Sequence, residues 1–186
     1  MVVVEAPKED RFRKNMEIAF DNEKYSDFTV KAGDQNFKVA KFMLRTQSEV
    51  FDAMFNHPMK EGQTNEMEIK ACDPEMVKLM LMFLYSGRVE NLDAVAEKLL
   101  PLAAQYQIKD LADVCVNAMG SSLNLKNIIE RSYLSADYDH LTDFKNKVLD
   151  FVQANYSKVQ QLDGWKAFTR DNGEMVAELL KKFARV

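Results

Sequence analysis

The feature that most constrains the fold of this chain is a change of hydrophobic period within residues 25–69. Apolar and polar residues alternate over Phe28–Lys31, which is the pattern of a half-buried β-strand. A turn signal, Ala-Gly-Asp, follows at residues 32–34, and the alternation resumes over Phe37–Val39. The first half of this segment therefore predicts a β-hairpin.

From Lys41 the spacing of apolar residues lengthens to that of an α-helix. The residues at this spacing are Phe42, Met43, Leu44, Val50, Phe51, Met54 and Phe55. Ser48 is well placed as the N-cap of a short helix through Phe55, and Glu49 complements the positive end of that helix. Alternation returns at residues 66–70 and predicts a third strand. This order of elements predicts an α+β fold with two short helices across a small sheet.

Several spaced motifs lie in this segment and shortly after it. They are Ser26-Asp27-Phe28-Thr29-Val30, Phe37-x-x-x-Lys41-x-x-Leu44, Ser48-x-x-Phe51-x-x-Met54-Phe55 and Phe83-x-Tyr85-Ser86-Gly87. In this register they resemble the BTB (POZ) domain family. Ala40 stands where that family usually has histidine, and Glu49 stands where it usually has proline. The resemblance implies the BTB fold, a small β-sheet flanked by a cluster of α-helices.

Helix signals continue beyond the third strand. Asp73 and Pro74 suit the N-cap and the first position of a helix, which Gly87 is expected to end as a C-cap. Asp93 and Asp110 are expected to begin the next two helices.

The BTB pattern is complete near residue 122, so we predict three parts of the chain. Residues 1–10 form a flexible N-terminus, residues 11–122 a BTB domain and residues 123–186 an all-α extension. In the extension we expect Asn124 to cap one helix and another helix to begin near His140.

A turn signal at Asp171-Asn172-Gly173 precedes a final predicted helix of the extension. Leu123-Asn124-Leu125, followed by Gly164-Trp165-Lys166, resembles the BACK (three-box) extension of the MATH–BTB family, which includes the speckle-type POZ protein. A MATH domain is not visible before the BTB pattern. We expect either a shortened form of a longer protein or recruitment of the client through another surface.

The composition argues against several classes of function. The net charge is −4 and no basic cluster with interleaved aromatic residues occurs, so we expect no nucleic-acid partner. No apolar run approaches the about 20 residues of a membrane span, so we expect no membrane partner. Met1–Val4 lacks the length and charged flank of a signal peptide. Cys72 and Cys115 are isolated, which favours buried, inert thiols in an intracellular setting, nuclear or cytoplasmic.

Catalytic and metal-binding motifs are also missing. Neither His57 nor His140 stands at a telling spacing from a cysteine, serine or carboxylate. A calcium loop starting at Asp137 would place Thr142 at the glycine position and Val148 at the bidentate glutamate position, so a helix–helix turn explains this cluster better. Without a P-loop or a dinucleotide fingerprint, we expect no enzyme activity, metal or cofactor.

The loop after the second short helix carries the strongest functional signal. It contains His57-Pro58-Met59-Lys60-Glu61, where Met59 could simply tuck under the sheet edge. BTB domains that bind cullin-3 share a hydrophobic–x–Glu motif in this loop, and Met59-Lys60-Glu61 resembles it. A thioether can fill an apolar groove while a glutamate accepts hydrogen bonds at its rim. The resemblance implies cullin-3 contacts by Phe55, His57, Met59, Glu61 and Tyr85.

An apolar stripe at helical spacing precedes the first strand. The sequence does not fix what this stripe covers, which could be its own domain. In BTB domains that resemble this chain, a helix in this place packs across a two-fold axis onto the partner subunit, and we favour that alternative. The dimer interface is then expected to include Phe12, Met16, Ala19, Phe20 and Asp27.

Two functions are compatible with these features. The first is a homodimeric adaptor that brings an unidentified substrate protein to a cullin-3 RING ubiquitin ligase. Its BACK-like helices would extend the cullin contact or add a second self-association surface. The second is a self-association or scaffold module, of the transcriptional corepressor or cytoskeletal type, without cullin binding. Met59-Lys60-Glu61 and the BACK-like tail favour the adaptor.

Overall fold

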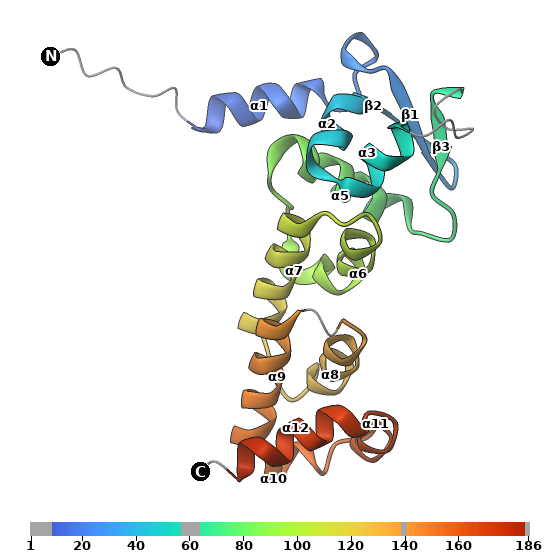
Figure 1. The fold of residues 1–186 in the computed structure, drawn as a ribbon. Helices are drawn as coiled ribbons and strands as arrows, with labels where there is room; N and C mark the ends of the chain where they lie inside the picture. The colour runs from blue at the N-terminus through green and yellow to red at the C-terminus, as the bar shows by residue number, and fades with distance from the viewer. Residues whose placement is uncertain (1–8, 57–63, 139–140, 185–186) are drawn as a thin grey trace, which may run out of the picture. The chain divides into compact units, whose positions relative to one another are not determined.

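The structure, a computed structural model, describes residues 9–56, 64–138 and 141–184 (Figure 1). The chain divides into two compact units, Met1–Cys115 and Val116–Val186, and their boundary falls inside helix α7 (Lys109–Ser121). The first unit combines a small sheet with helices, and the second is helical. The predicted fold class, α+β followed by a helical extension, is confirmed.

The described strands form one sheet with the order β2-β1-β3. Strand β1 (Phe28–Ala32) pairs antiparallel with β2 (Gln35–Val39), which confirms the predicted hairpin. The third strand, β3 (Glu66–Glu68), is shorter than expected and runs parallel to β1. Gly33 adopts φ +56° in the hairpin turn, a conformation that glycine reaches at no steric cost.

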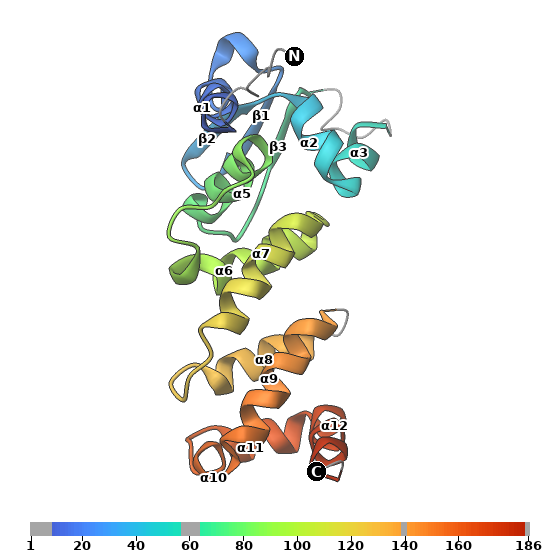
Figure 2. The ribbon, with the colours of Figure 1, turned by 90° about the vertical axis from the view of Figure 1, so that its left-hand side faces the viewer.

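Helix α5 (Pro74–Ser86) packs against β2 in the centre of the first unit (Figure 2). Both of its predicted ends are confirmed. Asp73 Oδ1 accepts a hydrogen bond from the Glu75 N–H at 3.0 Å, and Pro74 occupies the first helical position. At the other end Gly87 adopts φ +67° and donates its N–H to the Phe83 carbonyl at 2.8 Å.

Further helices surround this centre. They are α1 (Glu9–Ala19), the 3₁₀ turn η1 (Glu23–Tyr25), α2 (Lys41–Gln47), α3 (Glu49–Asn56) and α6 (Leu92–Gln105). Helix α1 packs on α5, while α2 contacts both α3 and α5. The Ser48 hydroxyl accepts the Phe51 N–H at 3.1 Å, so the predicted N-cap of α3 is confirmed.

Two predicted helix starts in this unit are wrong by one residue. Helix α6 begins at Leu92 because Asn91, at φ +50°, turns the chain into the helix and its carbonyl accepts the Ala94 N–H at 2.9 Å. Asp93 is therefore inside the first turn instead of capping it. Helix α7 begins at Lys109, with Asp110 also in its first turn.

The second unit consists of the end of α7 and further helices. These are α8 (Ile128–Asp137), α9 (Thr142–Ala154), α10 (Tyr156–Val159), α11 (Trp165–Asp171) and α12 (Gly173–Phe183). Helix α9 contacts α8, α10 and α12, and α11 contacts α8 and α12. Fully buried apolar side chains on α8, α9 and α10 fill the interior, among them Ile128, Phe144, Val148 and Val159.

The predicted start of α8 at Asn124 is wrong. Asn124 instead forms a polar turn before the helix, with its Oδ1 accepting the Lys126 N–H at 2.9 Å. The Asn124 carbonyl accepts the Ile128 N–H at 3.0 Å, so this turn leads into α8, which begins at Ile128. His140 lies outside the described residues, and α9 begins at Thr142. The turn signal near residue 172 is confirmed, because Asn172 separates α11 from α12.

Candidate protein-interaction site

A groove of about 630 Å³ opens on the described part of the first unit. One wall is formed by the α2–α3 corner, residues 45–56, and the other by the turn into α7, residues 107–110. The polar and charged lining residues include Arg45, Gln47, Glu49, Asp52, Asn56, Gln107, Lys109 and Asp110. Such a lining suits a polar protein partner better than an apolar small molecule.

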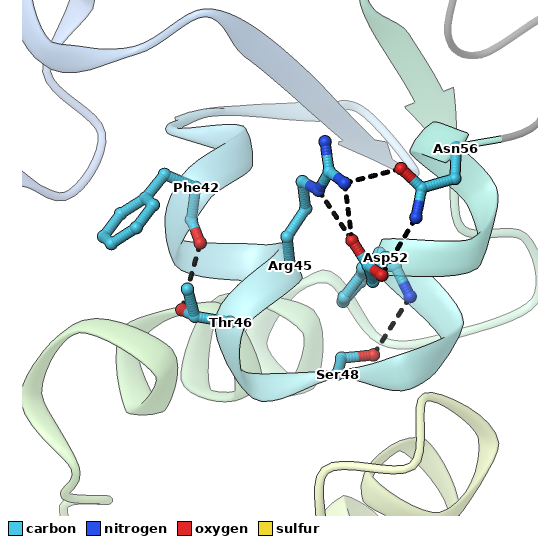
Figure 3. Close-up of polar contacts among 7 residues, drawn as sticks. Phe42, Arg45, Thr46, Ser48, Asp52 and Asn56 are labelled. Carbon is cyan, nitrogen blue, oxygen red and sulfur yellow. Dashed lines mark hydrogen bonds and ion pairs between the residues drawn. The ribbon is translucent and has the colours of Figure 1, made fainter.

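A closed polar network stiffens the α2–α3 wall of the groove (Figure 3). Arg45 donates from Nε to Asp52 Oδ1 at 2.7 Å and from Nη2 to Asn56 Oδ1 at 2.6 Å. Asn56 Nδ2 in turn donates to Asp52 Oδ2 at 2.9 Å. Each side chain is held by the other two, so the network orients all three polar groups.

Ser48 lines the groove and joins its two walls. The residue is 3% exposed, and its hydroxyl donates to the Tyr106 carbonyl at 2.5 Å while capping α3. The Tyr106 ring also stacks on Phe51, with centroids 4.7 Å apart. These contacts link residues that are far apart in the sequence, so they fix the spacing between α3 and the turn that precedes α7.

An ion pair connects the two walls at the surface. Lys109 Nζ lies 2.8 Å from Glu49 Oε1, and both side chains are exposed. The hydrogen bond to Lys109 lowers the pKa of Glu49, and the same bond raises the pKa of Lys109. Glu49, where the family usually has proline, thus links the start of α3 to the start of α7.

Among the residues predicted to contact cullin-3, Phe55 and Tyr85 are described by the structure. Phe55 is half-buried at the end of α3, with its ring 4.9 Å from that of Phe28 in an edge-to-face arrangement. Tyr85 is 6% exposed, and its hydroxyl accepts the Ala40 N–H at 2.7 Å. Burial raises the pKa of Tyr85, so the hydroxyl remains protonated. In the isolated chain Tyr85 therefore faces the interior. His57, Met59 and Glu61 lie outside the described residues.

Helix α1 presents apolar side chains both to its own domain and to solvent. Phe20, just after α1, stacks on Phe37 at 6.4 Å and meets Tyr85 edge-on at 5.5 Å. Phe12 is 67% exposed, and so is Ile18 at 65%. Met16 and Ala19 are half-buried. Part of the predicted stripe thus covers its own domain, while Phe12 remains available to a partner.

Helical spacing does not single out Ile18 in the sequence. It lies outside the stripe spaced at three and four residues, and it is flanked by Glu17 and Ala19. No periodicity marks such a residue, because its exposure depends on how α1 docks on α5. Asp27, predicted at the dimer interface, is exposed and accepts the Lys41 N–H at 2.7 Å.

The thiols differ from one another in their environments. Cys115 is buried and free, and burial raises its pKa from 9.0 to about 12. Cys72 is half-buried, so the prediction that both thiols are buried is wrong for Cys72. Among the residues that the structure describes, no group of three or more His, Cys, Asp or Glu side chains could hold a metal ion. In the same residues no helix is long and apolar enough to cross a membrane.

Comparison with known proteins agrees with this fold. The family model of the BTB/POZ domain matches residues 16–123. The BTB domain of zebrafish PATZ1 aligns with a TM-score of 0.52 and 18% identity over 66% of this chain and 100% of that one. The BTB domain of human Gigaxonin aligns with a TM-score of 0.49 and 14% identity over 63% of this chain and 97% of that one.

The family match covers more than half of the chain and contains the sheet, the α2–α3 corner and the groove. It ends near the start of the helical extension, so the predicted BACK likeness lies beyond it. BTB domains are protein-interaction modules that commonly self-associate, and they are not typically catalytic. The chain therefore belongs to the BTB/POZ domain family.

Proposed function

We propose that the chain is a homodimeric adaptor that docks the N-terminal domain of cullin-3 and presents a substrate protein to the ubiquitin ligase. The observation that carries this proposal is Met59-Lys60-Glu61, which follows α3 in the register of a BTB domain. This tripeptide resembles the hydrophobic–x–Glu motif of cullin-3-binding BTB domains.

The groove beside the end of α3 supports the proposal. Asn56, the last residue of α3, lines the groove, and the motif begins three residues later. Interfaces between proteins commonly combine an apolar anchor with a polar rim. Met59 supplies a candidate anchor, and the oriented groups of Arg45 and Asp52 supply a candidate rim.

The helical unit also supports an adaptor. Its paired helices, α8 with α9 and α11 with α12, follow the BTB domain as a BACK-like extension would. In this proposal they belong to the MATH–BTB type of extension and either enlarge the cullin contact or add a self-association surface. Two linked cullin sites in a dimer would raise avidity through effective concentration.

The docking motif is tested by calorimetric titration with the cullin-3 N-terminal domain. Burying a methionine contributes about 1.5–3 kcal/mol, so Met59→Asp is expected to weaken binding at least about tenfold. Glu61→Ala is expected to weaken binding as well. Glu90→Ala, at an exposed position before α6, serves as the matched control and should leave the affinity unchanged. Equal affinity of Met59→Asp and the unmodified chain would refute docking through this motif.

The groove has its own test in the same titration. Lys109→Glu reverses a charge on one wall, and Lys98→Glu makes the same change at an exposed position of α6 outside the groove. A groove that belongs to the cullin surface predicts weaker binding for Lys109→Glu than for the unmodified chain. The same affinity for both variants would remove the groove from the docking surface.

A self-association or scaffold module without cullin binding is the second candidate. It is favoured by the exposure of Phe12 and Ile18 on α1, which offers an apolar surface for a second copy. Self-association is common to both proposals, so cullin binding is what separates them. Failure of the unmodified chain to bind cullin-3 would favour the scaffold.

A further inference from the structure

Lys41 makes more contacts than its place at the start of α2 requires. Its Nζ donates to Asn65 Oδ1 at 2.5 Å. The same ammonium lies 5.6 Å from the ring centroid of Phe28 and 5.6 Å from that of Phe55. One cation therefore contacts residues from β1, from the end of α3 and from the approach to β3.

Helix formation does not explain a lysine at this position. Lys41 is the first residue of α2, where the helix dipole disfavours a positive charge. The backbone N–H of Lys41 is satisfied separately, because it donates to Asp27 Oδ1 at 2.7 Å. The contacts of the ammonium are therefore the feature of Lys41 that distinguishes it from a generic helix-starting residue.

Both oxygen atoms of Asn65 accept hydrogen bonds, and one of these bonds comes from the Lys41 ammonium. Its backbone adopts φ +55°, a left-handed conformation that asparagine tolerates better than most residues. In this conformation its carbonyl accepts the Thr29 N–H at 3.0 Å, while its side chain accepts from Lys41. Asn65, which immediately precedes β3, is thus hydrogen-bonded to β1 through its backbone carbonyl and to α2 through its side chain.

We propose that Lys41 is a positioning residue that ties the end of α3, at Phe55, to the start of β3, at Asn65. The motif Met59-Lys60-Glu61 lies between these two anchored positions in the sequence. Fixing both positions reduces the conformational entropy lost when a partner binds the residues between them. The effect on docking rests on the proposed function, whereas the tie between Phe55 and Asn65 does not.

Lys41→Met tests the tie, because it keeps an unbranched side chain and removes the charge. Losing a charge-assisted hydrogen bond and two cation–π contacts is expected to weaken cullin-3 binding about tenfold. Lys41→Arg retains the cation and should restore most of the affinity. Lys78→Met, a half-buried lysine on α5 whose ion-pair partner is Glu75, is the matched control and should bind as the unmodified chain does.

A second readout does not depend on cullin. Amide hydrogen exchange at Phe55 and Asn65 should be faster in Lys41→Met than in Lys78→Met, with thermal denaturation confirming that both variants are folded. Asn65→Gly keeps the left-handed backbone accessible and removes the acceptor, so its effect on exchange should not add to that of Lys41→Met.

Each outcome decides one of the two proposals. Binding by the unmodified chain with equal affinity for Lys41→Met would overturn the positioning role in docking and leave the adaptor proposal standing. No binding by any variant would overturn the adaptor proposal, and exchange would then decide on Lys41. Equal exchange at Phe55 and Asn65 in both methionine variants would overturn the tie itself.

Discussion

At the scale of single residues, Ser48 makes two hydrogen bonds from a buried position. It caps α3 through the Phe51 N–H and donates to the Tyr106 carbonyl. Ser48→Ala removes the cap and leaves a buried carbonyl without this donor, so it should lower the free energy of unfolding by about 1–3 kcal/mol in urea denaturation. Ser121→Ala, at an exposed position, should change it by less than about 0.5 kcal/mol. Equal losses in both variants would contradict this role of Ser48.

Cys115 gives a prediction about pH. Burial raises its pKa from 9.0 to about 12, so between these values the folded chain keeps a proton that the unfolded chain loses. The free energy of unfolding should therefore fall as the pH rises through this interval. Urea denaturation at about pH 8 and about pH 10.5 measures the fall. Cys115→Ala should show a smaller decrease, and an identical decrease would assign the effect to other groups.

At the scale of elements, substitution by alanine should change the stability of the chain differently at two glycines that lie at helix ends. Gly87 ends α5 at φ +67°, and alanine there would be strained by about 1 kcal/mol. Gly173 begins α12 without a positive φ, and a Cβ there would meet nothing within 4 Å. Gly173→Ala should therefore be neutral or stabilising by up to about 1 kcal/mol.

Thermal denaturation of the two glycine variants measures this contrast. Gly87→Ala is expected to melt at a lower temperature than the unmodified chain, and Gly173→Ala at the same or a higher temperature. A loss of stability in Gly173→Ala as large as that in Gly87→Ala would show that backbone conformation does not set the difference.

At the scale of the whole molecule, the proposed assembly is a dimer. Light scattering should give a mass about twice the 21.4 kDa of the chain, since two-fold dimers are the commonest closed assembly. Phe12→Asp places a charge in the proposed interface on α1 and should shift the mass toward the monomer. Phe42→Asp, with a similar exposed fraction on α2, should leave the dimer intact. A monomeric unmodified chain would contradict the proposed interface.

The elements that could be predicted are those specified by neighbouring residues. The hairpin followed from alternation near Phe28 and from Gly33, and the caps at Ser48, Asp73 and Gly87 were placed correctly. Where a helix start depended on the preceding turn, the prediction failed. Asn91 and Asn124 each organise the backbone before their helices, so neither α6 nor α8 begins at the polar residue expected.

The sequence by itself determined the order of hairpin, short helices and buried helix in the first unit, because periodicity, caps and turns act over a few residues and agree with one another. The BTB fold followed from the resemblance of the spaced motifs to that family. Only the tertiary structure decided the groove and the role of Lys41. Ser48 meets Tyr106, and Lys41 meets Asn65, through contacts between distant parts of the chain. Side-chain burial is equally a tertiary property, since helical spacing marks Phe42 as apolar but does not show that it is 70% exposed.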